Sequence, residues 1–162
     1  LDGETNAYFH NTEEIDKSLI QQLTYVRFST YQAADFVFFP SVVTTCEKNG
    51  QQLTSILSDS YHGTHADPHT GATVVLAVQE LPRPFIPNEG QRVSGLCLSG
   101  PGIQTNRFIG YPAEQMDTQL WWVETRNQLC REFPLGIELI LFDSECNVMV
   151  LPRSTEVKRW HM

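Results

Sequence analysis

The densest group of potentially reactive side chains in this sequence runs from His62 to His69. It holds three imidazoles and a carboxylate, and such ligands suit zinc or iron. Gly63 and Pro68 are instead typical of a solvated turn, and no helical pair of histidines fixes a ligand geometry. We therefore expect a turn and no metal site. If a metal were held, His62, His65 and His69 would be its ligands.

A second chemical candidate is the run Arg153-Ser154-Thr155, which follows an apolar strand near the end of the chain. A guanidinium, two hydroxyls and free backbone amides could converge there on an anion. The alternative, which we favour, is that Arg153 forms a structural ion pair at the end of the strand.

Other familiar catalytic patterns fail on inspection. The segment 95–101 has the glycine spacing of a phosphate-binding loop, but Pro101 stands where that loop needs its lysine, so a turn is the better interpretation. No GxSxG elbow is present, and no cysteine neighbours a histidine in the sequence. The paired Glu13 and Glu14 are explained by the positive end of a helix dipole. The residues alone therefore predict no evident active site.

Composition limits the function classes further. A chain of 162 residues with 41% apolar and 19% charged residues predicts a single globular domain over residues 1–162. Its net charge of −8 argues against nucleic acid and anionic membrane surfaces as partners, because the eleven cations are scattered along the chain. No apolar run approaches the ~20 residues that span a bilayer. The four cysteines show no CxxC pairing, which favours free thiols and a cytoplasmic location.

The start of the sequence predicts that the chain is a fragment. Leu1 is no initiator methionine, and Asp2-Gly3 is a strong turn signal before a strand at 7–9. A helix follows, for which Asn11 or Thr12 is the expected cap. Apolar residues at helical spacing should form its buried face: Ile15, Leu19, Ile20, Leu23 and Val26.

The rest of the sequence alternates strand and helix patterns, which indicates a layered α/β fold with central strands covered on both faces. We expect a loop at 82–90 and a turn at 100–102. A long helix at 113–130 should bury Met116, Leu120 and Val123. The remaining expected elements are strands at 36–39, 71–78, 93–98, 107–109, 137–142 and 148–151 and a short helix at 51–57.

Several segments, in order along the chain, resemble one protein family. The most specific are 133–141 and 151–155, preceded by 71–73, 96–103 and the helix 15–28 that leads to Ala34-Asp35-Phe36. Together they resemble the H subunit of the carbon–phosphorus lyase core complex, the PhnH family. The resemblance assigns a structural role to these motif residues: Gly71, Ala72, Thr73, Gly100, Gly102, Pro134, Leu135, Gly136 and Pro152.

The resemblance implies a three-layer α/β/α sandwich with a mixed sheet, similar to the large domain of pyridoxal-phosphate-dependent transferases but without that cofactor. No cofactor is therefore expected. The lysines agree with this, because Lys17, Lys48 and Lys158 are not placed like a buried Schiff-base lysine. The family also has several tens of residues before the position of Leu1, and their absence would leave part of the sheet uncovered.

For function, the resemblance implies an accessory subunit that acts through protein contacts. Family members form homodimers and join the G, I and J subunits. With the L subunit, the complex is implicated in making ribose 1-phosphonate 5-triphosphate from ATP and an alkylphosphonate. No catalytic residue is carried over. The alternatives are a self-contained transferase or hydrolase at Arg153, Ser154 and Thr155, and an anion-binding regulatory module there. Trp121 and Trp122 are interface candidates, since one ring at helical spacing can join the core while the other points elsewhere.

Overall fold

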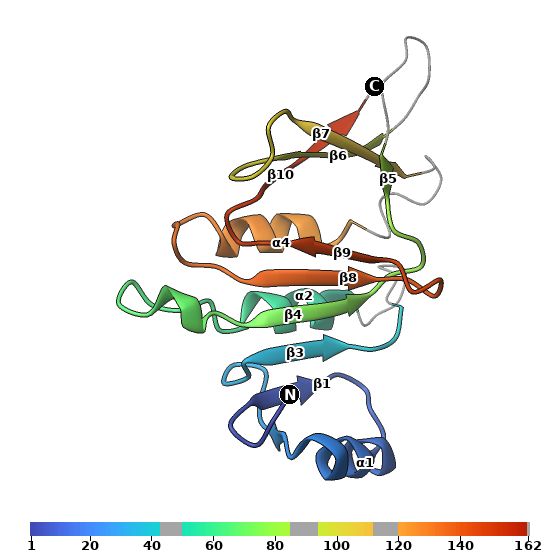
Figure 1. Ribbon diagram of the computed structural model, residues 1–162, viewed down its shortest axis with the longest axis vertical. Helices are drawn as coiled ribbons and strands as arrows, with labels where there is room; N and C mark the ends of the chain where they lie inside the picture. The colour runs from blue at the N-terminus through green and yellow to red at the C-terminus, as the bar shows by residue number, and fades with distance from the viewer. Residues whose placement is uncertain (43–49, 85–93, 112–119, 162) are drawn as a thin grey trace.

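The computed structural model describes residues 1–42, 50–84, 94–111 and 120–161. Strands and helices alternate over most of this length (Figure 1). The helices are α1 (Glu14–Thr24), α2 (Gly50–Ser58) and α4 (Trp122–Leu129), with a 3-10 helix at Pro68–Thr70. The strands are β1 (Asn6–Phe9), β2 (Arg27–Phe28), β3 (Phe36–Phe39), β4 (Thr73–Ala77), β5 (Arg83–Pro84), β6 (Ser94–Ser99), β7 (Arg107–Tyr111), β8 (Glu138–Phe142), β9 (Val148–Leu151) and β10 (Glu156–His161).

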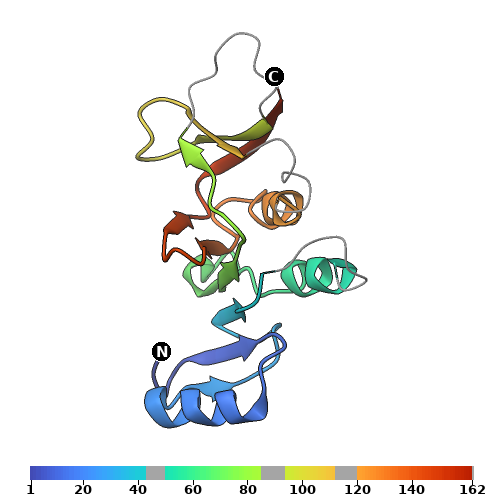
Figure 2. The same ribbon diagram turned by 90° about the vertical axis from the view of Figure 1, so that its right-hand side faces the viewer.

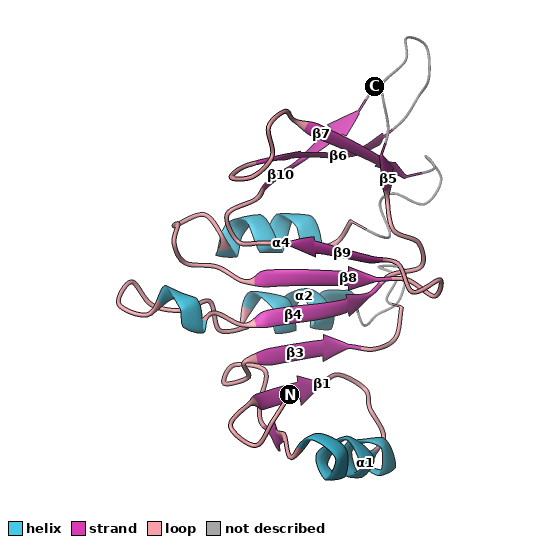
Figure 3. Ribbon diagram, viewed as in Figure 1, coloured by secondary structure: helices cyan, strands magenta, loops and turns pink. Residues whose placement is uncertain are grey.

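The strands form two sheets, which Figure 3 shows one above the other. The larger sheet has six strands in the order β2-β1-β3-β4-β8-β9, all parallel except β9, which pairs antiparallel with β8. The smaller sheet has four antiparallel strands in the order β10-β6-β7-β5. The expected α/β class with a mixed sheet is confirmed, and the second sheet is an addition that the sequence did not suggest.

One face of the large sheet packs against α2 and α4, which lie on the same side of it (Figure 2). Alternate strand residues such as Val37, Phe39, Leu139 and Leu141 are buried there, as the two-residue period of a strand requires. Trp122 of α4 is fully buried among them. These contacts make the main hydrophobic core, and burying each such side chain contributes roughly 1.5–3 kcal/mol.

The opposite face of the same sheet is only partly covered, and we call it the open face. The strand register aligns Phe9, Phe38, Val75, Ile140 and Val150 in one row across it. The first four are partly exposed, and Val150 is 54% exposed. Helix α1 lies at the β1–β2 end and does not extend over β4, β8 and β9 (Figure 1). In the residues described, the third layer of the expected sandwich is therefore missing over these strands.

Helix α1 also departs from expectation on its own surface. The prediction that its apolar residues form a buried face is wrong, because Ile15, Leu19 and Leu23 are 79%, 54% and 73% exposed. The reason is its position at the end of the sheet, where no other described element packs over those side chains. Of the predicted set only Val26, after the helix, is fully buried, while Ile20 is partly buried.

The start of α1 differs as well. Glu13 occupies the capping position, and its side chain makes no capping hydrogen bond. Asn11 has a φ of 52°, in the left-handed region, and Thr12 Oγ1 donates to the carbonyl of His10. The prediction that Asn11 or Thr12 caps the helix is therefore wrong, because both side chains belong to the turn that precedes it.

Most other predicted elements are confirmed within a few residues, including the turn at 100–102, where the Ile103 amide donates to Gly100 at 3.0 Å. The helix expected at 113–130 is found as α4, which begins at Trp122. Residues 112–119, including Met116, lie outside the described part, as does most of the 82–90 loop. Strands β2, β5 and β10 were not predicted. No helix in the described ranges is long and apolar enough to cross a membrane.

The segments that precede β4 and β8 are locked together through their backbones. The Gly136 amide donates to the carbonyl of His62 at 2.9 Å, and the Glu138 amide donates to that of Ala72 at 3.1 Å. A Cβ at Gly71 would lie 2.3 Å from the carbonyl oxygen of Gly136. This contact explains why a glycine occurs at position 71, since no side chain fits there.

We predict that Gly71→Ala destabilises the protein by about 3 kcal/mol, because the added methyl group must push apart two backbone segments. Gly3→Ala is the matched control: its Cβ would have only ordinary contacts at 3.7 Å, with Tyr25. Denaturant unfolding followed by circular dichroism measures both. Equal stability of the two variants would contradict the close approach.

Candidate anion-binding pocket

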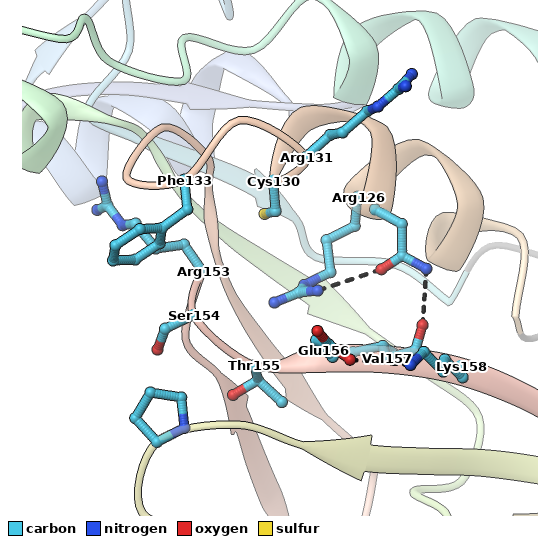
Figure 4. Close-up of a pocket in the computed structure, with 12 residues that line it drawn as sticks. Arg126, Cys130, Arg131, Phe133, Arg153, Ser154, Thr155, Glu156, Val157 and Lys158 are labelled. Atoms are coloured by element: carbon cyan, nitrogen blue, oxygen red, sulfur yellow. Dashed lines mark hydrogen bonds and ion pairs between the residues drawn. The ribbon is translucent and has the colours of Figure 1, made fainter.

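An open pocket of about 530 Å³ lies between the last turn of α4 and the turn that joins β9 to β10 (Figure 4). The sequence candidates Arg153, Ser154 and Thr155 all line it. The other lining residues are Pro101, Arg126, Asn127, Cys130, Arg131, Phe133, Glu156, Val157 and Lys158.

The pocket concentrates positive charge in an acidic protein. Four of the eleven cationic residues of the chain line it: Arg126, Arg131, Arg153 and Lys158. Its lining carboxylate, Glu156, lies 3.0 Å from Lys158 Nζ and accepts a hydrogen bond from Ser99. The Lys158 ammonium, which is the main cause, and the Ser99 hydroxyl hold the pKa of Glu156 below its usual range. Two cationic residues, Arg126 and Arg131, remain without a carboxylate partner in the described part of the chain.

Arg126 is fully buried on α4, on the same stripe of the helix as Trp122 and Val123. One terminal nitrogen donates to the Pro152 carbonyl at 2.7 Å and the other to Asn127 Oδ1 at 3.3 Å. The Nε–H group has no hydrogen-bond partner in the part of the chain that the structure describes. Burial lowers the pKa of the guanidinium, against the opposing influence of Cys130 and Glu138. The site thus contains a buried charge whose hydrogen bonds are only partly satisfied.

Arg153 is held by structural partners. Its Nε donates to Glu138 Oε1 at 2.7 Å, and its backbone amide donates to Glu138 Oε2 at 3.1 Å. A terminal nitrogen donates to the carbonyl of Pro68, which lies within the His62–His69 segment. Figure 4 shows the guanidinium groups of Arg153 and Arg126 extending in different directions. The expected structural ion pair is therefore present, and it leaves Arg153 with less freedom to bind a ligand than Arg126.

Ser154 and Thr155 provide hydroxyl groups at the same turn, which is closed by the Thr155 amide donating to Pro152 at 2.9 Å. Neither hydroxyl has a hydrogen-bond partner among the described residues. Gly100 passes close to this turn, since a Cβ there would lie 2.7 Å from the Ser154 carbonyl oxygen. The glycine turn after β6 thus lies against the pocket wall.

The histidine segment takes no part in this pocket. His62 and His65 are exposed on the loop that follows α2, and His69 is exposed within the 3-10 helix. The Asp67 amide donates to Thr64 Oγ1 at 3.0 Å. No group of three metal-ligating side chains is found in residues 1–42, 50–84, 94–111 and 120–161. The segment forms the expected turn.

The two tryptophans have different environments. Trp122 is fully buried in the core, as expected for one ring of the pair. Trp121 is partly buried and contacts Phe39 edge to face, with ring centroids 6.3 Å apart. Trp121 alone stays an interface candidate.

The described lining of the pocket is rich in donors for an anion, while the Cys130 thiol is directed toward the Ile137 carbonyl at 3.7 Å. Guanidinium, ammonium and hydroxyl groups are the donors that bind oxyanions. Sequence reasoning missed Arg126, Arg131 and Lys158. The one signal in the sequence was the position of Arg126: a charged residue three positions after Val123, on the apolar stripe of the predicted helix, indicates a buried charge.

We predict that Glu138→Gln lowers the free energy of unfolding by about 2 kcal/mol, because the half-buried Arg153 loses its counter-charge. Glu14→Gln is the control: it removes the exposed pair of Glu14 with Lys17, which should change stability little. Thermal unfolding of both variants measures the difference. Equal losses would show that the Arg153 pair is no stronger than a surface contact.

Comparison with known proteins agrees with the resemblance. Residues 1–158 match the family described as bacterial phosphonate metabolism protein (PhnH). A curated relative from Stutzerimonas stutzeri, named "Putative C-P lyase subunit protein HtxG", is 32% identical over 132 residues. The match covers 82% of this chain and 55% of the relative, so the chain spans about half the length of the relative. This chain belongs to the PhnH family of bacterial phosphonate metabolism proteins.

Proposed function

We propose that the protein is an accessory subunit of a carbon–phosphorus lyase complex and serves phosphonate breakdown through protein contacts. The family match over residues 1–158 supports the pathway, and the relative's name supports the role of a subunit. The reaction of the assembled complex would be formation of ribose 1-phosphonate 5-triphosphate from ATP and an alkylphosphonate.

The observation that carries the contact role is the open face. Strands in the middle of a parallel sheet are normally covered on both faces, and this sheet has apolar residues on both. The row from Phe9 to Val150 is continuous across five strands and is partly exposed throughout. A contiguous apolar surface of this kind is typical of an interaction site.

The proposed occupant is another subunit of the complex, with the G, I and J subunits as the first candidates and L joining the assembly. Obligate complexes bury more apolar surface than transient ones, which fits Phe9, Phe38 and Ile140 better than a polar ligand would. A homodimer in isolation is the competing arrangement, and Trp121 is a further contact candidate at another surface.

The remaining expectations from the resemblance belong to the same proposal. They are a cytoplasmic location and a fold like the large domain of pyridoxal-phosphate-dependent transferases without the cofactor. Two of the lysines are engaged in ion pairs, Lys17 with Glu14 and Lys158 with Glu156. Lys48 lies outside the described residues.

We predict that Val150→Lys prevents co-purification of the other subunits from phosphate-starved cells, because a charge would be buried in an apolar contact. Leu23→Lys on α1 is the matched control, since Leu23 is also exposed and apolar. Unchanged circular dichroism would show that both variants fold. If only the Leu23 variant failed to co-purify the other subunits, the contact surface would lie on α1, which would contradict the proposal.

A photo-crosslinking residue at Val75 would identify what covers the open face. Crosslinks to another subunit support the proposal. Crosslinks to a second copy of this chain would make the face a homodimer interface, and crosslinks within the same polypeptide would make it intramolecular; either result contradicts the proposed occupant.

A further inference from the structure

We propose that the pocket between α4 and the β9–β10 turn binds a phosphorus oxyanion, a phosphate or phosphonate group, with Arg126 as its deepest contact. This assigns a ligand-binding site to the chain itself and does not depend on which partner covers the open face.

The first reason is the state of Arg126. A fully buried guanidinium is costly unless an anion neutralises it, and no carboxylate forms an ion pair with it in the described part of the chain. The nearby carboxylate, Glu138, is paired with Arg153. The C-terminal end of α4 offers only about half a negative charge. A bound anion would supply the missing counter-charge.

The second reason is the set of unused donors that share the pocket. An arginine has five N–H groups, and Arg126 directs two hydrogen bonds to protein oxygens. Its Nε–H and the hydroxyls of Ser154 and Thr155 have no partner among the described residues. A tetrahedral oxyanion has enough oxygens for all three donors, and because the Nε–H is covered in this structure, the Arg126 side chain would have to turn toward the ligand to donate from it.

The third reason is the charge balance, which favours a dianion. Of the four lining cations, Arg153 is offset by Glu138 and Lys158 by Glu156, which leaves Arg126 and Arg131. Among the described residues these two cations have no ion-pair partner, and their combined charge matches a phosphate or phosphonate dianion better than a carboxylate. Because the pocket holds about 530 Å³, an organic substituent on the phosphorus also fits.

A purely structural role for Arg126 is the alternative, because its hydrogen bond to Pro152 fastens the end of β9 to α4. The two roles predict different behaviour of the variant Arg126→Met, which keeps the length of the side chain and removes the charge. A structural tether would lower stability and leave anion affinity unchanged in the protein that still folds.

Isothermal titration calorimetry with inorganic phosphate, methylphosphonate and acetate tests the proposal on the purified protein. We expect both phosphorus anions to bind and acetate to bind much more weakly at the same ionic strength. Arg126→Met should weaken phosphate binding by about thirtyfold or more, as expected when a buried charged partner is removed. Arg27→Met is the control, because Arg27 is exposed on β2 and is no part of the pocket.

Failure of both phosphorus anions to bind, equal binding of acetate, or an unchanged affinity in Arg126→Met would each overturn the proposal. If Arg126→Met does not fold, the double variant Arg131→Gln with Ser154→Ala gives the answer instead, and an unchanged affinity there overturns it equally. Tighter binding of tripolyphosphate than of phosphate would indicate a nucleotide-type phosphate chain, and tighter binding of methylphosphonate a phosphonate. Because no partner is present, a negative result here leaves the subunit role intact.

Discussion

The ion pair between Arg153 and Glu138 is the interaction on which the rest of this structure depends. Glu138 is the first residue of β8, and Arg153 lies in the turn after β9. The pair therefore joins the beginning and the end of the β8–β9 hairpin. The same guanidinium reaches Pro68, just before the segment where Gly71 and Gly136 approach each other. This partly buried ion pair thereby connects the segments that lead into β4 and β8 with the turn that leads into β10 of the smaller sheet.

This junction separates the two surfaces to which function is assigned. On the core side of β8, α4 presents Arg126 to the pocket beneath the β9–β10 turn. On the other side, Ile140 of the same strand belongs to the open face. The pocket lining shares no residue with the row on the open face, so a ligand and a protein bound at these two surfaces would not have to displace each other.

How far the sequence predicted this molecule differs between its parts. Strands such as 36–39 and 148–151 are clear from local apolar patterns, because strand formation and turn chemistry act over a few residues. The prediction that the apolar face of α1 is buried was wrong. Periodicity shows that a helix has an apolar side, but it does not show whether another element packs on that side. The pocket was half predicted. Arg153, Ser154 and Thr155 are contiguous, whereas Arg126 and Arg131 reach them only through the packing of α4.

Strand β9 is the last strand of the large sheet, so one of its edges has no neighbour among the described strands. Such an edge can recruit strands from other chains and lead to aggregation. Here β9 has only four residues, and Pro152 follows it directly, so an incoming strand would find few amide groups to pair with. Pro152, whose carbonyl accepts from Arg126, therefore also limits the length of edge that another strand could pair with.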